Sequence, residues 1–466
     1  MRLGLAAALA ALLCGPAGGQ TAPSVAGKVL VMSDLHFDPM ADPRLVDRLV
    51  AAEPEQWATV LESSDDKSLS RYGRDANWML VRSAFRYMKQ TIPDPALILI
   101  SGDFLAHGLR REFDAAAGDH SRAAHRAFVG KTMQFLALQL KQTFPATPIV
   151  PALGNNDDEC GDYQLQPDGP FLADTLPILH ALVGGGGPGM DDSWRHHGNS
   201  SVKVAGIRVL STNTDFLSIH YRNACGSPAD PDPGQATLGW LEAELAAASQ
   251  AQERVWLLYH IPPGIDGYAT LRQGMCPGYL IPMWKQAFAD RFYTLLRRYS
   301  ETIAASFVGH THMDDFRLIG DGDAHYAFAL ITPAVSPIFG QNPAFRAASY
   351  DARGGILDET TYYLTNLAAA AADGNVPPEW QPEYTFSREW NLPRVDLASL
   401  ERLYSRIQDE PAVGARWHSI FTVSSRFYWS QLSGGPSDAQ AVRAFRCATG
   451  NVLPSEYRQC YCGDHG

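Results

Sequence analysis

Basic residues and long apolar runs are both scarce in this chain. Its 466 residues include 38 Lys and Arg against 50 Asp and Glu, and the formal net charge is -12 at pH 7. No stripe of Lys and Arg is present, which argues against a nucleic-acid binder, because phosphate contacts need clustered basic residues. Beyond the N-terminus, no apolar run has the length that a transmembrane helix needs. An acidic chain can still bind a phosphorylated ligand where metal ions supply local positive charge.

The chain also lacks a phosphate-binding P-loop and internal repeats. The Gly-rich stretch 184–189 has no Lys-Ser/Thr to complete a P-loop, so we expect an ordinary loop there. Apolar residues, in contrast, are plentiful. Hydrophobic residues make up 45% of the chain and charged residues 19%, which predicts a globular protein with a large core. The length suits one large domain with an appendage, or two domains.

The N-terminus has the pattern of a secretory signal. Arg2 precedes an apolar run from Leu3 to Cys14, and small residues with Pro16 follow. We expect residues 1–22 to be a signal peptide that is removed, which would make the mature protein secreted or periplasmic, with no transmembrane segment. A buried N-terminal helix and lipidation of Cys14 are the alternatives.

Cysteine usage fits an exported protein. The chain has seven cysteines, and all except Cys14 lie beyond the signal. An even number of cysteines in an exported chain indicates disulfides, although their connectivity stays open. Three of them lie close together near the C-terminus, so we expect Cys447 to pair with Cys460 or Cys462. The other three cysteines are Cys160, Cys225 and Cys276.

Predicted strands and helices alternate along the chain. Uninterrupted apolar runs predict strands at 28–32, 96–100, 148–153, 203–212, 254–259, 303–308 and 327–332. Helical apolar spacing predicts helices at 75–90, 125–143, 238–252 and 284–299. Strands without polar alternation belong to sheets that are covered on both faces, so the predicted fold class is α/β.

Polar side chains follow five of these strands directly. The segments are Asp34-Leu35-His36, Gly102-Asp103, Gly154-Asn155-Asn156-Asp157, His260, and Gly309-His310-Thr311-His312. In α/β folds, the carboxyl ends of strands meet in one crevice, where binding sites form. We therefore expect these carboxylate, imidazole and amide groups to lie close together.

These donor types predict a site for two divalent metal ions. Carboxylate, imidazole and amide donors suit Zn, Mn or Fe. We assign Asp34, His36 and His312 to one ion, and Asn155, His260 and His310 to the other. Asp103 stands alone on its loop and is the expected bridging carboxylate. Such a pair activates a bridging hydroxide and clamps phosphoryl oxygens during in-line attack, so the hydroxide would be the nucleophile.

The set of motifs resembles that of the calcineurin-like metallophosphoesterases. More narrowly, three further segments resemble the acid sphingomyelinase-like phosphodiesterases. They are Tyr72-Gly73-Arg74-Asp75, Gly102-Asp103-Phe104-Leu105-Ala106-His107, and Thr332-Pro333 with the following Asn342-Pro343-Ala344-Phe345-Arg346. The resemblance implies a four-layer α/β/β/α sandwich over residues 23–352 and a helical, Cys-containing region over 353–466 packed on it. It also implies zinc as the favoured metal, with Mn or Fe as alternatives.

One position departs from the pattern of the superfamily. Most members have Gly-Asn-His where this chain has Gly154-Asn155-Asn156. Asn156 can donate a hydrogen bond, but it cannot act as an acid near neutral pH. In the resembled group, the residue corresponding to His107 lies near the phosphate and is a proposed acid. We therefore expect His107 and Asn156 to be the catalytic side chains.

The resemblance implies a phosphodiesterase acting on a small phosphorylated substrate: a nucleotide, polyphosphate or a phospholipid head group. The first predicted strand begins at Lys28, so we expect the shorter layout without the saposin-like domain that helps acid sphingomyelinase take up lipid. An endopolyphosphatase, a nucleotide phosphohydrolase and a phosphomonoesterase would share the same site. A non-catalytic protein that keeps its metals and binds a phosphorylated ligand is the alternative from another class.

Overall fold

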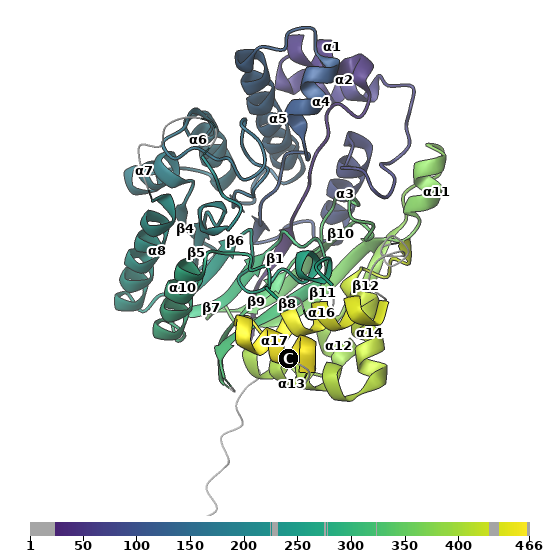
Figure 1. Ribbon diagram of the computed structural model, residues 1–466. Helices are drawn as coiled ribbons and strands as arrows, with labels where there is room; N and C mark the ends of the chain where they lie inside the picture. Colours follow the sequence, from purple (N-terminus) through teal and green to yellow (C-terminus); the bar gives the residue numbers. More distant parts are fainter. Residues whose placement is uncertain are drawn as a thin grey trace, which may run out of the picture.

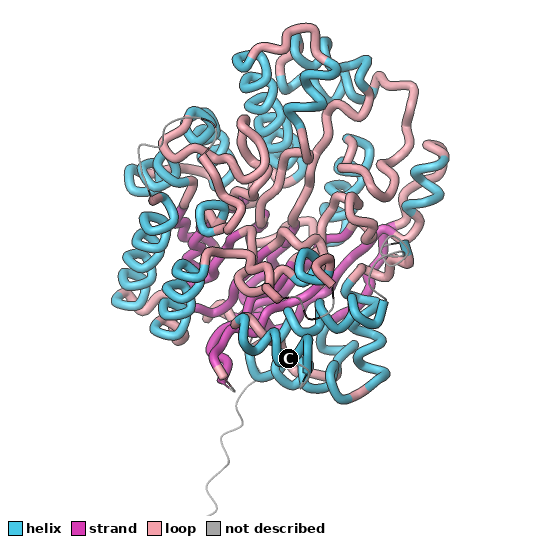
Figure 2. The backbone as a smooth tube through the Cα atoms, viewed as in Figure 1, coloured by secondary structure: helices cyan, strands magenta, loops and turns pink. Residues whose placement is uncertain are grey.

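Two six-stranded β-sheets form the centre of the molecule, with helices on their outer faces (Figures 1 and 2). The computed structural model describes residues 24–223, 225, 232–274, 276, 278–322, 324–427 and 438–463. The predicted signal peptide, residues 1–22, lies outside the described residues. The predicted α/β/β/α sandwich with a helical C-terminal region is confirmed.

The first sheet has the order β12-β11-β10-β1-β2-β3. Its strands are β1 (Val25–Met32), β2 (Leu97–Ile100), β3 (Ile149–Pro151), β10 (Ala344–Asp351), β11 (Ile356–Leu364) and β12 (Trp380–Thr385). Strands β1, β2 and β3 are parallel, whereas β10 pairs with β1 in the antiparallel sense. The carboxyl ends of β1, β2 and β3 therefore lie at one edge of the sheet.

The second sheet has the order β4-β5-β6-β7-β9-β8. Its strands are β4 (Ser200–Val204), β5 (Ile207–Thr212), β6 (Val255–Tyr259), β7 (Ile303–Val308), β8 (Asp315–Asp321) and β9 (Ala324–Ile331). Strands β5, β6, β7 and β9 are parallel, while β4 and β8 close the two edges as antiparallel partners. The seven predicted strand regions are all present, and the region 203–212 forms parts of the two strands β4 and β5.

Successive side chains of β1 point to opposite faces of the sheet, and both faces are apolar. This explains why the strands appear in the sequence as unbroken apolar runs. Val29 and Val31 pack in the cluster that includes Trp256 of the second sheet. Leu30 and Met32, between and after them, pack in the cluster on the helical side. Both faces of the strand are thus buried, and no position is left for polar alternation.

Helices cover each outer face. The first sheet is covered through residues of α3 (Trp78–Thr91), α5 (Arg122–Thr143) and α6 (Pro170–Val183), and the second sheet by α8 (Pro233–Gln250) and α10 (Gln286–Arg298). The remaining helices before residue 352 are α1 (Val46–Ala51), α2 (Trp57–Glu62), α4 (Leu109–Ala116), α7 (Pro188–His197) and α9 (Gly267–Leu271), with short 3₁₀ turns at Pro43–Leu45, Pro54–Gln56 and Asp215–Leu217. Helix α3 begins later than predicted because the Asn77 side chain accepts from the N–H of Leu80 and caps it there.

The chain beyond residue 352 first completes the sheet and only then becomes helical. Strands β11 and β12 pair with β10 and with each other, so the sheet continues past the expected boundary. The helices are α11 (Leu367–Ala372), α12 (Phe386–Trp390), α13 (Leu397–Asp409), α14 (Pro411–Phe421), α16 (Asp438–Gly450) and α17 (Pro454–Cys462). Side chains of α13, α14, α16 and α17 pack in the apolar cluster that lies between the two sheets. These helices lie at the bottom of Figure 1, in yellow-green and yellow.

Two disulfides are present among the described residues, Cys447–Cys460 and Cys160–Cys225. The first confirms one of the two pairings expected for Cys447. Cys276 and Cys462 are free thiols. Burial, and then the neighbouring Cys276 thiol, raise the pKa of Cys462 to about 11. Within the described part of the chain, no helix is long and apolar enough to cross a membrane.

The Cys447–Cys460 bridge should stabilise the C-terminal helices, because it joins α16 to α17 across a separation of 13 residues. Cross-linking a loop of this size restricts the unfolded chain and contributes about 3 kcal/mol. We expect the Cys447→Ser/Cys460→Ser variant to unfold at lower urea concentration than the parent protein. The free-thiol variant Cys276→Ser is the control and should unfold close to the parent; an equal loss in both would contradict this role.

Candidate metal centre

The expected ligands directly follow the carboxyl ends of five strands, three in one sheet and two in the other. Strands β1, β2 and β3 of the first sheet lead to Asp34 and His36, to Asp103, and to Asn155, respectively. In the second sheet, β6 leads directly to His260, and β7 to His310 and His312. Because the sheets pack face to face, these loops meet at one end of the sandwich.

The first three assigned ligands converge on one point. The Nε2 atoms of His36 and His312 lie 3.1 Å apart. Asp34 Oδ1 lies 3.3 Å from Nε2 of His312 and 3.7 Å from Nε2 of His36. Two imidazole nitrogens and a carboxylate oxygen that point at each other in this way form a suitable set of metal ligands.

Asp103 lies between this group and the second one. Its Oδ2 atom is 3.3 Å from Nε2 of His36 and 3.2 Å from Nε2 of His260. A single carboxylate oxygen thus faces one histidine of each assigned group. This position is the one that a bridging carboxylate would occupy.

The second group forms around His260. Nε2 of His260 lies 3.1 Å from Oδ1 of Asn155. The ring of His310 stands edge-on to that of His260, with centroids 5.1 Å apart. The backbone N–H of His310 also donates to the Asp34 carboxylate, so the second group is tied to the first.

Backbone carbonyls select the coordinating nitrogen of two histidines. Nδ1 of His36 lies 3.0 Å from the Leu105 carbonyl oxygen, and Nδ1 of His260 lies 2.7 Å from that of Ser101. An N–H at Nδ1 satisfies each carbonyl and leaves the Nε2 lone pair for a metal ion. Both Nε2 atoms are the ones that face Asp103.

The centre concentrates negative charge in a buried place. Burial opposes ionisation of Asp34 and Asp103, but neighbouring imidazoles outweigh it and hold the pKa of both carboxyls below its usual range. Burial also opposes the charge on His36 and His260, yet Asp103 foremost raises their pKa values, to about 10 and about 9. The two carboxylates therefore attract positive charge, which divalent cations are suited to provide.

Burial is the largest effect on the pKa values of the other two histidine ligands, and neighbouring imidazoles add to it against the opposing carboxylates. The pKa of His310 and of His312 is lowered to about 3, so both imidazoles are neutral at physiological pH. A neutral imidazole is the form that binds a metal ion. The donors present thus fit two divalent cations in number and chemistry, and metal binding at His36 and His260 would displace the protons that the carboxylates favour on those two imidazoles.

Five of the expected ligands have unusual backbone conformations. Positive φ angles occur at Asp34, His36, Asp103, His310 and His312, between 38° and 71°. Residues other than glycine adopt this region at a cost, and they do so where the surroundings enforce it, often at functional sites. The adjacent Gly102 has a φ of 100°, and an added Cβ there would lie 2.7 Å from the backbone nitrogen of Gly154.

Asp157 fixes the loops that carry two of the ligands. Its carboxylate accepts from the backbone N–H groups of Asp103, Phe104, Leu105 and Gly154 at 2.8–3.1 Å. The side chain is fully buried. Burial and the nearby Asp103 raise the pKa of Asp157 to about 7, while the donated N–H groups favour its charged form. Asp157 thus orients the loops of Asp103 and Gly154, and its burial excludes an exposed position on a solvated loop.

Asn156 does not point toward solvent. Its side-chain amide donates to Oδ2 of Asp103 over 3.0 Å, and its backbone N–H donates to Oδ1 over 2.9 Å. The side chain is 5% exposed. The Asn156 amide thus contacts the central carboxylate, and its catalytic role stays a prediction.

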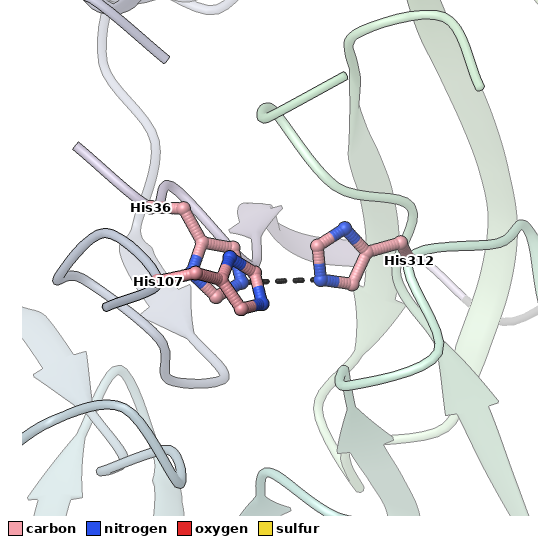
Figure 3. Close-up of side chains that lie close together, drawn as sticks. All are labelled: His36, His107 and His312. Carbon is pink, nitrogen blue, oxygen red and sulfur yellow. Dashed lines mark hydrogen bonds between the residues drawn. The ribbon is translucent and has the colours of Figure 1, made fainter. Parts of the chain in front are cut away.

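His107 lies beside the first group of ligands and remains accessible. Its ring stacks on that of His36 with centroids 4.0 Å apart, and His312 lies opposite both (Figure 3). Nδ1 of His107 lies 3.0 Å from Oδ1 of Asp75, whose other oxygen accepts from the backbone N–H of His107. The side chain is 34% exposed. Asp75 thus orients His107, a contact that the sequence motif containing Asp75 did not disclose.

In each of two sets of three residues, the donor atoms lie within 4.8 Å of one another. One set is Asp34, Asp103 and His260, and the other is His36, His107 and His312. The predicted ligands are all brought together, and His107 lies among them. An exposed aromatic side chain that the sequence did not single out, Phe339, borders this region, with its ring 4.6 Å from that of His312 and 5.8 Å from that of His107.

Comparison with known proteins identifies the family. The model of the calcineurin-like phosphoesterases matches residues 27–314. The chain is 29% identical to sphingomyelinase phosphodiesterase D of Dictyostelium discoideum over 68% of its length and 66% of that protein. It is 26% identical to human acid sphingomyelinase-like phosphodiesterase 3b, over 93% of this chain and 90% of the relative. A cyclic GMP-AMP phosphodiesterase of Rattus norvegicus is 26% identical, over 97% and 96% of the two chains. The chain belongs to the calcineurin-like phosphoesterases.

Proposed function

We propose that this protein is an exported, two-metal phosphodiesterase of the acid sphingomyelinase-like type. The observation that carries the proposal is the position of Asp103 Oδ2, 3.3 Å from His36 Nε2 and 3.2 Å from His260 Nε2, between two groups of metal-binding side chains. The two disulfides are compatible with export. The names of the relatives support diester bonds as the target.

The two groups of ligands would each hold one divalent ion. Asp34, His36 and His312 would bind one, Asn155, His260 and His310 the other, and Asp103 both. When bound, such ions lower the pKa of a water molecule for attack on phosphorus and neutralise phosphoryl oxygens. Zinc suits this donor set, and Mn or Fe would also fit.

The protein side chains would orient these groups and supply a proton. Asn156 donates to Asp103 and so fixes the bridging carboxylate. Asp75 holds His107 through Nδ1, which leaves Nε2 as the nitrogen that can protonate the leaving oxygen. Phe339, at 42% exposed, would contact the part of the substrate beyond the phosphate.

Soluble nucleotides or other small phosphodiesters are the proposed substrates. The aromatic ring of Phe339 beside His107 and His312 suits a planar leaving group. Polyphosphate and phospholipid head groups could reach the same centre and are the alternatives. A phosphomonoesterase, or a binding protein without turnover, would keep the same ligands.

Side-by-side assays test the proposal. We expect as-purified protein to cleave bis(4-nitrophenyl) phosphate, to lose that activity after treatment with a chelator, and to regain it when zinc is added. The rate with 4-nitrophenyl phosphate should be lower, because a monoester has no second ester group to contact the part of the site beyond the phosphate.

The same assays separate the alternatives. Faster cleavage of the monoester would identify a phosphomonoesterase. If protein containing two zinc ions cleaved neither ester, the catalytic proposal would fail and binding of nucleotides would be measured instead. Cleavage that persisted in fully metal-free protein would contradict the role of the metals.

A further inference from the structure

A short segment outside the metal centre contacts ligands assigned to the second ion. This segment, Cys160–Tyr163, follows the loop that carries Asn155. Oδ1 of Asp162 accepts a hydrogen bond from Nδ2 of Asn155 over 2.7 Å. The backbone N–H of Tyr163 donates to the carbonyl of Asn155 over 2.8 Å. The first contact holds the side chain of Asn155, and the second holds its backbone.

The Asp162 contact determines which end of the Asn155 amide faces the centre. An ionised carboxylate can only accept hydrogen bonds, so the NH₂ end must point to Asp162. The amide oxygen then points to His260, whose Nε2 lies 3.1 Å away. Only the oxygen can bind a metal ion, so Asp162 places the correct atom of Asn155 in the centre.

Tyr163 contacts a second ligand of the same ion. Its hydroxyl lies 3.4 Å from Nε2 of His310, and its ring is edge-on to that imidazole at 80°. The hydroxyl can accept from an N–H at Nε2, a tautomer that leaves the Nδ1 lone pair for a metal ion. His36 and His260 use the opposite nitrogen, because backbone carbonyls accept from their Nδ1 atoms.

The segment is itself held from outside. Cys160 forms a disulfide with Cys225. The backbone N–H of Arg222 donates to the carbonyl of Tyr163 over 3.0 Å, and the ring of His220 lies 5.2 Å from that of Tyr163. A covalent link and a hydrogen bond thus attach the segment to the chain around residue 222.

We propose that Asp162 and Tyr163 are positioning residues that set the affinity of the second metal ion, and that the Cys160–Cys225 disulfide maintains them. The proposal rests on the two-metal centre proposed above. It assigns the segment to Asn155 and His310, and hence to one ion rather than both. Outer partners of metal ligands commonly change metal affinity about 10- to 100-fold when they are removed.

Zinc titration of metal-free protein, in competition with a chromophoric chelator, tests this. Unaltered protein should bind two zinc ions. In Asp162→Ala and in Tyr163→Phe, one ion should keep its affinity and the other should bind about 10- to 100-fold more weakly. Asp162→Asn should recover part of the loss, because its amide oxygen can still accept from Asn155. Tyr221→Phe is the matched control: it removes a hydroxyl bonded to the Leu165 carbonyl nearby and should bind both ions normally.

Combined variants identify the ion that is affected. If Asp162 acts through Asn155, adding Asp162→Ala to Asn155→Ala should cause little further loss of zinc affinity. Adding Asp162→Ala to His36→Ala should instead give a protein that binds both ions more weakly. Cys160→Ser/Cys225→Ser should resemble Tyr163→Phe. Unchanged affinities in folded Asp162→Ala and Tyr163→Phe, or an equal loss at both ions, would overturn the inference. If the unaltered protein bound fewer than two zinc ions, the two-metal proposal itself would fail.

Discussion

Replacing Asp103 by asparagine should remove most of the activity together with metal binding. The change deletes the negative charge shared by the two groups of ligands. It also places an amide NH₂ among donors, since both the backbone and side-chain N–H groups of Asn156 point at the Asp103 carboxylate. We expect turnover of a phosphodiester to fall by roughly 10³-fold or more, because electrostatic groups of this kind act on the reacting charge directly.

The measurement combines zinc content by mass spectrometry with diester hydrolysis. Asp103→Asn should hold fewer than two zinc ions and gain less thermal stability from added zinc than the parent. Asp47→Asn is the control, because Asp47 also accepts a backbone N–H, from Gly118, but outside the centre. Full zinc content in Asp103→Asn would show that this carboxylate is not shared.

Replacing His107 by alanine should lower turnover strongly and leave the metals in place. His107 stacks on His36 and is held by Asp75, so its exposed nitrogen can reach a substrate without being needed as a ligand. Loss of a general acid reduces the rate by about 10²- to 10⁴-fold. The reduction should be smaller for a 4-nitrophenyl ester than for an alkyl ester, because nitrophenolate leaves without protonation.

Two readouts distinguish this role from others. Near-normal turnover of alkyl esters by His107→Ala would rule out general acid catalysis by this residue. Loss of a zinc ion would instead make His107 a ligand, since its donor atoms lie within 4.8 Å of those of His36 and His312. Asp75→Asn should show part of the effect on turnover, because it keeps the size of the partner but weakens its hold on Nδ1.

The convergence of the proposed metal ligands could be predicted because their signal in the sequence is local. Each follows a buried apolar strand directly, and the carboxyl ends of such strands must meet. The direction in which Asn156 points could not be predicted in the same way. Its amide donates to Asp103, which is 53 residues away in sequence, and the choice depends on how two loops pack. The contact of Asp75 with His107 was missed for the same reason, since the two residues are 32 positions apart.

The C-terminal region shows a similar limit on a larger scale. The sequence predicted a helical region from residue 353, but β11 pairs with β10 and β12 with β11, and these pairings depend on long-range contacts. The prolines of segment 377–382 favour a linker on sequence grounds, yet its residues 380–382 begin β12, an edge strand on which Pro382 is tolerated.

The positive φ angles of the ligands have a consequence for how this site can change over time. A glycine at such a position would relax the backbone, so a chain released from the need to hold metals would gain stability from the substitutions that destroy the centre. Drift after loss of activity should therefore be fast and hard to reverse at these positions. Glycine is therefore expected to replace Asp34, His36, Asp103, His310 and His312 readily only in chains that no longer need those side chains.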